Sequence, residues 1–325
     1  MNFSNQRLVE MREAIREAID EEMTRDERVF VMGEEVAEYN GAYKVTKGML
    51  DKWGPKRVID TPIAELGFAG LGVGAAMCGV RPVVEFMSWN FSFVGCDQLI
   101  SNACKMHYMS GGRFSVPIVF RGPNGAAAQV SCQHSHCVEA LYGNLPGFII
   151  VCPSTPYDAK GLLKSCIRNN NPCLFLENEL MYGDKGEIPD EEYLVPIGKA
   201  RIVQEGSELT LVAHGEMVRR CQEAAKALKR SCEIIDLRTI KPLDRTTIVE
   251  SVKKTNRCLL VEEGHLFAGI ASEVAFQIQE SCFDYLDAPI GRVCQRETPM
   301  PYSKPLEAET LPTVERIVEA ARQLF

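Results

Sequence analysis

Apolar residues recur along the first half of the chain with two different spacings, which predict alternating helices and strands. A three- and four-residue spacing near the start predicts one apolar face of an opening helix, formed by Leu8, Met11, Ile15, Ile19 and Met23. Short apolar runs predict strands at 29–32, 116–120, 147–151 and 173–176. Residues 156–168 predict a helix that begins with a proline and is capped by Ser154 or Thr155. Strands that alternate with helices predict a mostly parallel sheet covered on both faces.

A polar stretch at 183–206, with two prolines and four glycines, is typical of a crossing between domains. Alternation then resumes, with expected strands at 209–213, 233–237 and 258–261 and expected helices at 216–228, 246–254 and 270–279. The chain of 325 residues is long enough for two cores. We therefore predict an α/β protein with one doubly wound domain at 1–190 and a second, smaller one at 200–325.

Composition excludes several classes of function. The chain is 46% hydrophobic and 25% charged, which is typical of a folded globular protein, and its net charge of -8 argues against nucleic acid or an anionic membrane surface as a partner. No run reaches the ~18 apolar residues of a membrane span, and residues 1–7 carry no apolar signal core or Arg-rich transit stretch. The expectation is a soluble protein, cytoplasmic if bacterial, or in the mitochondrial matrix if it is a processed form.

Thirteen cysteines are scattered along the chain without a CxxC pair. Several have apolar or small neighbours, among them Cys78, Cys152, Cys166 and Cys173. This distribution predicts reduced, buried thiols and argues against a disulfide framework or a zinc site.

The glycine-rich segment 57–91 allows two interpretations. Gly70, Gly72 and Ala75 formally satisfy the G-x-G-x-x-A pattern of a dinucleotide-binding turn, and Glu85 stands near the place of a ribose-binding acid. The stretch before these glycines is interrupted by a proline and two acids, so it does not read as the apolar strand which that motif requires.

Helix packing explains the same glycines better. Gly67, Gly70 and Gly74 recur at three- and four-residue spacing, so one face of a helix would be bare and a neighbouring helix could approach closely. Glu65 opens this apolar helix. It could simply favour the helix through the N-terminal dipole, or it could be a buried carboxylate with a chemical task, such as proton exchange with a ring nitrogen.

Five long motifs, in order, make the chain resemble a known family. They are GEEVAEYNGAYKVTKG, IDTPIAELGFAGLGVGAAMCGVRPVVEFM, VPIVFRGPNGA, QHSHC and LENELMYG, and the second half follows with DLRTIKPLD and PMPYSKPLE. These segments resemble the beta subunits of the decarboxylating component of pyruvate dehydrogenase, in the thiamine-diphosphate-dependent 2-oxo acid dehydrogenase family. The resemblance implies a pyrimidine-binding domain of the thiamine diphosphate fold, followed by a transketolase-C-terminal-like domain.

The resemblance also implies roles for three side chains. Glu65 matches the glutamate that contacts the aminopyrimidine ring of thiamine diphosphate, and Phe91 matches the aromatic residue packed against that ring. His134 matches a histidine that faces the reacting centre and acts in acyl transfer, for which an imidazole is suited because it titrates near neutrality. Taken alone, Phe91 also fits an ordinary core aromatic, and His134 also fits a solvated loop histidine.

A potassium ion is a further ligand that the resemblance implies. The matching positions are Ile118, Cys166, Ile167, Asn169 and Asn171, whose oxygen atoms suit a hard cation. Asn169 departs from the family, which often has aspartate there. A simple helix-ending turn at 168–171 explains the segment equally well.

The sequence lacks the GDG signature with a following asparagine pair that holds diphosphate through magnesium. The resemblance supplies that half of the site from an alpha subunit in an alpha2-beta2 tetramer, which would dock onto a dihydrolipoyl acetyltransferase core. The implied reaction is oxidative decarboxylation of pyruvate with reductive acetylation of a lipoyl group. Alternatives are a branched-chain 2-oxo acid or acetoin dehydrogenase beta subunit, a non-catalytic scaffold of the same fold, and an NAD-binding Rossmann protein.

Overall fold

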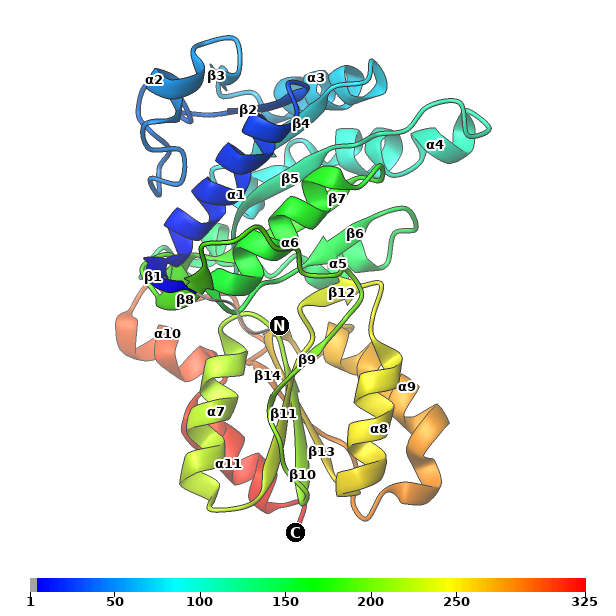
Figure 1. Ribbon diagram of the computed structural model, residues 1–325. Helices are drawn as coiled ribbons and strands as arrows, with labels where there is room; N and C mark the ends of the chain where they lie inside the picture. Colours follow the sequence, from blue (N-terminus) through cyan, green and yellow to red (C-terminus); the bar gives the residue numbers. More distant parts are fainter. Residues whose placement is uncertain (1–4) are drawn as a thin grey trace. The chain divides into compact units, whose positions relative to one another are not determined.

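The computed structural model describes residues 5–325, and the chain divides into two compact units (Figure 1). The first contains the chain up to Asn124 together with Asn144–Ile197. The second contains Gly125–Gly143 and Gly198–Phe325. Residues 125–143 therefore leave the first unit after one of its strands and pack with the second.

The first unit is built on a parallel sheet with strand order β6-β7-β5-β4-β2-β3. A separate antiparallel pair joins β1 to β8. The strands and helices of this unit are β1 (Gln6–Glu10), α1 (Met11–Arg25), β2 (Val29–Gly33), α2 (Met49–Trp53), β3 (Val58–Asp60), α3 (Glu65–Met77), β4 (Arg81–Glu85), η1 (Trp89–Phe93), η2 (Gln98–Ala103), α4 (Met106–Met109), β5 (Val119–Asn124), β6 (Ile149–Val151), α6 (Pro156–Arg168), β7 (Cys173–Asn178), η4 (Glu179–Met181) and β8 (Lys185–Pro189).

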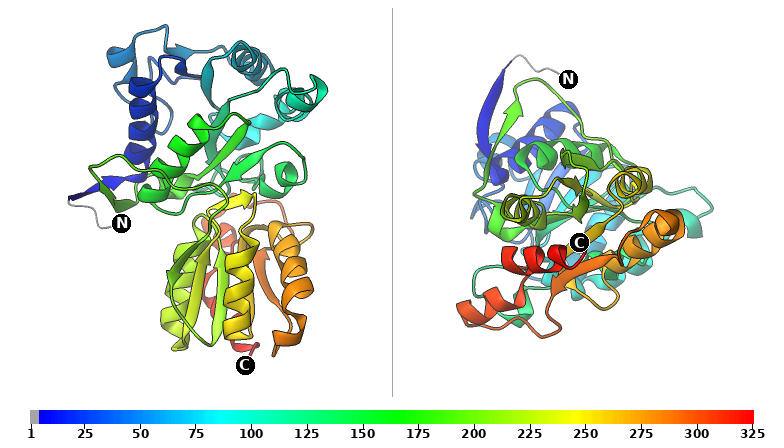
Figure 2. Two further views of the ribbon diagram at one scale, coloured as in Figure 1. Left: turned by 45° about the vertical axis from the view of Figure 1, so that its right-hand side comes forward. Right: turned by 90° about the horizontal axis from the view of Figure 1, so that it is seen from below.

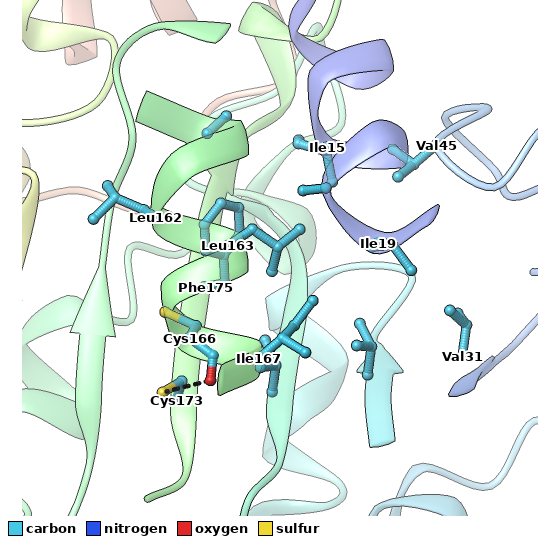
Figure 3. Close-up of a cluster of buried hydrophobic side chains, with 14 of the residues drawn as sticks. Ile15, Ile19, Val31, Val45, Leu162, Leu163, Cys166, Ile167, Cys173 and Phe175 are labelled. Atoms are coloured by element: carbon cyan, nitrogen blue, oxygen red, sulfur yellow. Dashed lines mark hydrogen bonds between the residues drawn. The ribbon is translucent and has the colours of Figure 1, made fainter. Parts of the chain in front are cut away.

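Helices α1 and α6 pack against each other and bury the main apolar core of this unit (Figure 3). Ile15 and Ile19 of α1 face Leu163 and Ile167 of α6, and Phe175 of β7 lies behind them. The three- and four-residue spacing of the apolar positions on α1 thus creates the buried face that the sequence predicts. The expected opening helix begins at Met11 and does not include Leu8. Leu8 lies on strand β1 and is 64% exposed, so it is not part of the buried helix face.

The start of α6 confirms the predicted cap. The Thr155 hydroxyl accepts a hydrogen bond from the backbone N–H of Asp158 at 3.1 Å, and Pro156 occupies the first turn, where its missing N–H costs nothing. The cap is therefore Thr155 rather than Ser154.

The second unit is built on a five-stranded sheet with strand order β14-β13-β10-β11-β9. The pairs β14–β13, β13–β10 and β10–β11 are parallel, whereas β9 is antiparallel to β11. Helices α7 and α11 cover one face of this sheet and α8 and α9 the other (Figure 2). The elements of this unit are η3 (Cys132–His134), α5 (Glu139–Gly143), β9 (Arg201–Gln204), β10 (Leu209–Ala213), α7 (Met217–Leu228), β11 (Cys232–Asp236), β12 (Thr239–Lys241), α8 (Arg245–Thr255), β13 (Cys258–His265), α9 (Ile270–Cys282), η5 (Phe283–Tyr285), β14 (Gly291–Gln295), α10 (Lys304–Thr310) and α11 (Val314–Arg322).

Three expectations from the sequence need correction. The polar stretch 183–206 contains strands β8 and β9 rather than only a crossing. Strand β5 begins at Val119 rather than at residue 116, in keeping with Pro117, which has no N–H to donate to a ladder. Cys78 is exposed, whereas Cys152, Cys166 and Cys173 are buried and free as predicted.

Within residues 5–325, no helix combines the length and the apolar character that a membrane crossing requires.

Two glycines of α3 give a matched test of how this helix packs. A Cβ at Gly72 would lie 2.8 Å from Cγ2 of Val84 and 3.1 Å from Cδ1 of Ile118, whereas a Cβ at Gly74 would meet nothing within 4 Å. Gly72→Ala should lower the free energy of unfolding by about 1–3 kcal/mol because of overpacking. Gly74→Ala should raise it by up to about 1 kcal/mol because alanine favours helix. Urea denaturation of the isolated chain measures both, and equal effects would contradict this packing.

Candidate active site

Acidic side chains gather at the carboxyl ends of neighbouring parallel strands in the first unit. Glu34 directly follows β2, Asp60 ends β3 and Glu85 ends β4. The carboxyl edge of an open parallel sheet is where such folds bind ligands, because the loops leaving it diverge and leave a crevice. The geometry at this edge therefore decides what the unit can bind.

Glu65 opens α3 as the sequence predicts. The residue before it, Ala64, provides no side-chain cap, and the Glu65 side chain is buried at the first turn of the helix, where the helix dipole favours its negative charge.

Glu34 is a second buried acid, which the sequence analysis missed. Its exposed fraction is 4%, and within the described residues its Oε1 atom has no hydrogen-bond partner. Burial, together with the negative charge of Glu65, raises the pKa of Glu34 to about 7. Glu34 is therefore a carboxyl group with a pKa near neutrality, and one of its own oxygens is left to accept a hydrogen bond from a ligand. The sequence offered one signal for Glu34, which is that an acidic residue follows the strand predicted at 29–32 and its terminal glycine.

Asp60 fixes the loop that carries Glu34. Its two carboxylate oxygens accept hydrogen bonds from the backbone N–H groups of Ala37, at 2.6 Å, and Glu38, at 3.0 Å. The backbone N–H of Thr61 donates to the Gly33 carbonyl at 2.9 Å. The ends of β2 and β3 are thus tied together, and this holds the loop of Glu34 near the chain that leads to Glu65.

Phe91 lies on the short 3-10 helix η1, which follows β4, and its side chain is half-buried. The segment after η1 packs on the first turn of α3, because a Cβ at Gly95 would lie only 3.0 Å from the carbonyl oxygen of Glu65. Only a glycine allows this approach without displacement. The structure thus brings the segments of Phe91 and Glu65 together.

A buried ion triad lies at the same edge of the sheet. The guanidinium of Arg121, on β5, donates to the carboxylates of Glu85 on β4 and Glu177 on β7, and Tyr182 donates to Glu177 at 2.7 Å. Glu85 is 2% exposed, and burial raises its pKa while Arg121 opposes the rise. Because Glu85 is committed to Arg121, it is not available to bind a ribose, which removes the main support for a dinucleotide site.

His134 belongs to the second unit, unlike Glu65 and Phe91. It ends the short helix η3, and its side chain is half-buried. Its backbone N–H donates to the Ser131 carbonyl at 3.3 Å. The predicted site residues are therefore divided between the two units.

The predicted potassium positions lie together around the C-terminal end of α6, but their carbonyl oxygens already accept donors from the chain. The Arg81 guanidinium donates to the carbonyls of Ile167, at 2.8 Å, and Asn169, at 2.9 Å. The carbonyls of the other three positions accept from a neighbouring N–H or thiol: Ile118 and Asn171 from Cys173, and Cys166 from Asn169 and Cys173. A guanidinium thus supplies positive charge there, and this geometry does not favour potassium, which stays a prediction.

Comparison with known proteins extends this picture. Two family models match the chain: "Transketolase, pyrimidine binding domain" over residues 7–185 and "Transketolase, C-terminal domain" over residues 198–317.

Curated relatives match nearly the whole chain. The pyruvate dehydrogenase E1 component subunit beta of Rickettsia felis is 51% identical, covering 97% of this chain and 98% of the relative. The mitochondrial subunits of the same name from Dictyostelium discoideum and Homo sapiens are each 51% identical, covering 97% of this chain and 91% and 90% of their own lengths.

A solved structure described as a split gene transketolase, inactive beta4 tetramer, has the same fold. It superposes with a TM-score of 0.77 at 19% identity, covering 97% of this chain and 98% of that one.

Replacing Glu34 by glutamine should change the pH dependence of stability. The pKa of Glu34 lies near 7 in the folded chain, above that of an unfolded glutamate, so its unfavourable contribution grows as pH rises from about 4.5 to about 7 and is constant above. Glu34→Gln should therefore stabilise the isolated chain by ~1–3 kcal/mol at pH 8 and by much less at pH 4.5. Urea denaturation at both pH values measures this.

The exposed neighbour Glu38 offers a matched control in Glu38→Gln, which should leave the profile unchanged. A pH-independent effect of Glu34→Gln would contradict the raised pKa.

Proposed function

Because the chain belongs to the family of pyruvate dehydrogenase E1 component beta subunits, we propose that it forms one half of a thiamine-diphosphate-dependent active site. With an alpha subunit, it catalyses the oxidative decarboxylation of pyruvate and the reductive acetylation of a lipoyl group. The observation that carries this proposal is the buried acid pair of Glu34 and Glu65 at the carboxyl edge of a pyrimidine-binding-type sheet.

The first unit fits the pyrimidine half of the cofactor. Glu65 would accept a hydrogen bond from a ring nitrogen and hold or return the proton on that atom, while the half-buried ring of Phe91 would pack against the pyrimidine face. The neighbouring Glu34 would help to keep this pocket near the protonation state that such exchange needs. When bound, thiamine diphosphate supplies the carbon nucleophile and the electron sink for decarboxylation.

His134 would serve the later acyl-transfer stage. An imidazole can donate or accept a proton near neutral pH, which suits protonation of a sulfur or oxygen atom as the acetyl group moves to the lipoyl arm. This role rests on its place in the QHSHC motif and on its half-buried side chain.

A partner chain is needed to complete the site. The sequence has no GDG motif to hold magnesium and diphosphate. Around the start of α3, Ile63 is 84% exposed, Leu71 64% and Val94 61%, and the open position of Gly74 leaves the helix surface bare. Exposed apolar side chains beside a bare helix face are typical of a subunit interface. An alpha subunit that brings magnesium and covers α3 accounts for both features.

The remaining assignments follow the family. The assembled alpha2-beta2 tetramer would dock onto a dihydrolipoyl acetyltransferase core. Its compartment would be the cytoplasm for a bacterial source and the mitochondrial matrix for an organellar one, since the relatives include both kinds.

A branched-chain 2-oxo acid is the alternative substrate class. The segment LLKSCIRNNNPCLF in α6 and β7 resembles the branched-chain members of the family more than the pyruvate members. One or a few methylene groups in a pocket change specificity by only ~1–3 kcal/mol each. A comparison of kcat/KM for pyruvate and 2-oxoisovalerate in the reconstituted tetramer decides the matter. Preference for the latter substrate would overturn the assignment to pyruvate.

Calorimetric titration tests the divided site. Thiamine diphosphate with magnesium should bind tightly only when this chain is co-expressed with an alpha subunit, because the isolated chain lacks a clamp for the diphosphate. Tight binding to the isolated chain would contradict a divided site.

Substitution of Glu65 tests the acid pair. In the reconstituted tetramer, Glu65→Gln should lower kcat for pyruvate decarboxylation by about 10²- to 10⁴-fold, because the amide cannot exchange the proton. Glu223→Gln, at an exposed position on α7, makes the same charge change and should keep full activity. Unchanged decarboxylation in Glu65→Gln would refute the proposed role.

A further inference from the structure

Residues 125–143 form a segment that starts where β5 ends and is held by the second unit. The segment contains His134, so the position of this side chain depends on what fixes the segment rather than on the sheet that carries Glu65. The contacts that hold it are therefore candidates for controlling the acyl-transfer step.

The first residues of the segment, Gly125 and Ala126, contact a buried carboxylate. Glu263, on β13, accepts a hydrogen bond at its Oε1 atom from the backbone N–H of Ala126 at 2.5 Å. Gly125 has a φ of +82°, and a Cβ there would lie 2.5 Å from the same oxygen. A side chain at residue 125 would be strained at this φ and would displace the carboxylate, so glycine suits the contact with Glu263.

The backbone held by Glu263 is also hydrogen-bonded to the loop that carries His134, residues 125–136, here called the histidine loop. The backbone N–H of Gly125 donates to the carbonyl of His136 at 3.0 Å, which closes the loop two residues after His134. Inside the loop, the hydroxyl of Ser135 donates to the Ser131 carbonyl at 2.8 Å. A displacement of Gly125 and Ala126 would therefore also displace the loop that carries His134, because the Gly125–His136 hydrogen bond joins the two.

Other contacts hold the rest of the segment. The Ser131 hydroxyl donates to the Met300 carbonyl at 3.2 Å, and His214 lies 3.6 Å from the Glu139 carboxylate in a buried pair. Burial by itself lowers the pKa of His214, but Glu139 and further acids leave it raised, so this pair favours the charged imidazole. These contacts fix the middle and the far end of the segment, whereas Glu263 fixes its base.

Glu263 is a costly residue to keep for stability alone. Its side chain is buried, and burial with the nearby carboxylates of Glu216 and Glu139 raises its pKa to about 7, against the opposing effects of Ala126 and Arg220. A buried carboxyl group among other acids is unfavourable unless a specific contact or task compensates for it. One contact that it makes is the hydrogen bond from the backbone N–H of Ala126, at the base of the segment that carries His134.

We propose that Glu263 is a positioning residue for His134: by holding the Gly125–Ala126 backbone, it sets the placement of the histidine loop for acyl transfer. This inference rests on the proposed function of His134. It separates the two stages of the reaction, because Glu263 would affect the transfer to the lipoyl group and not the decarboxylation that depends on Glu65.

A double-mutant cycle in the reconstituted tetramer tests the proposal. Glu263→Ala, His134→Ala and the double variant are compared for acetylation of a lipoyl domain and for decarboxylation with an artificial electron acceptor. We expect Glu263→Ala to lower kcat for acetylation about 10-fold with KM for the lipoyl domain unchanged, since a small misplacement of a catalytic group costs one to two orders of magnitude. Decarboxylation should stay near the wild-type rate, and Glu263→Ala should add no further loss once His134 is absent.

Two variants separate positioning from loss of folding. Glu263→Gln keeps an oxygen that accepts the N–H of Ala126 and should restore most of the acetylation rate. Glu250→Ala, at an exposed position on α8, should have no effect on either activity. An equal loss from Glu263→Ala with and without His134, an unchanged acetylation rate, or failure of Glu263→Gln to restore it would overturn the proposal.

Amide hydrogen exchange of the same tetramers gives a readout that does not need activity. Glu263→Ala should increase exchange at residues 125–136, and Glu263→Gln should not. If the wild-type tetramer has neither activity, the proposed function fails, while this exchange pattern still decides whether Glu263 holds the loop. Unchanged exchange in Glu263→Ala would overturn the positioning role.

Discussion

The buried triad of Glu85, Arg121 and Glu177 is the constraint on which the first unit depends. It joins the carboxyl ends of β4, β5 and β7, and each partner is less than 3% exposed. Removal of one member would leave an unpaired charge in the interior, which costs far more than a surface pair. The loops that carry the candidate site leave from this edge, so the triad fixes the frame in which η1 and the chain to α3 can place their side chains.

Close backbone approach is the second requirement at this edge. Gly72 lets α3 settle against β4, and Gly95 lets the segment after η1 settle on the first turn of α3. Both contacts place Glu65 in the interior, where the neighbouring Glu34 carries a raised pKa. The opposite surface of α3 is apolar and exposed, so the packing that builds the acid pair also leaves a face that suits a partner chain.

The two units contribute different chemistry. The first holds the buried acids Glu34 and Glu65, and the second holds His134 on a segment that follows strand β5 of the first unit. Glu263 of the second unit accepts a hydrogen bond from the backbone N–H of Ala126, at the start of that segment. Under the proposed function, this division would allow decarboxylation and acyl transfer to be adjusted separately.

Local pattern by itself determined the alternation of helices and strands, the cap of α6, the glycine-rich α3 with Glu65 at its start, and the motifs that identify the family, because periodicity and caps depend on residues near in sequence. Only the tertiary structure decided that Glu34 lies beside Glu65, that Arg81 donates to the predicted potassium carbonyls, and that residues 125–143 pack with the second unit. It also revealed β8 and β9, whose short strands depend on distant partners. Each of these features is a contact between residues far apart in the chain, and the spacing of residues along a single sequence does not record such contacts.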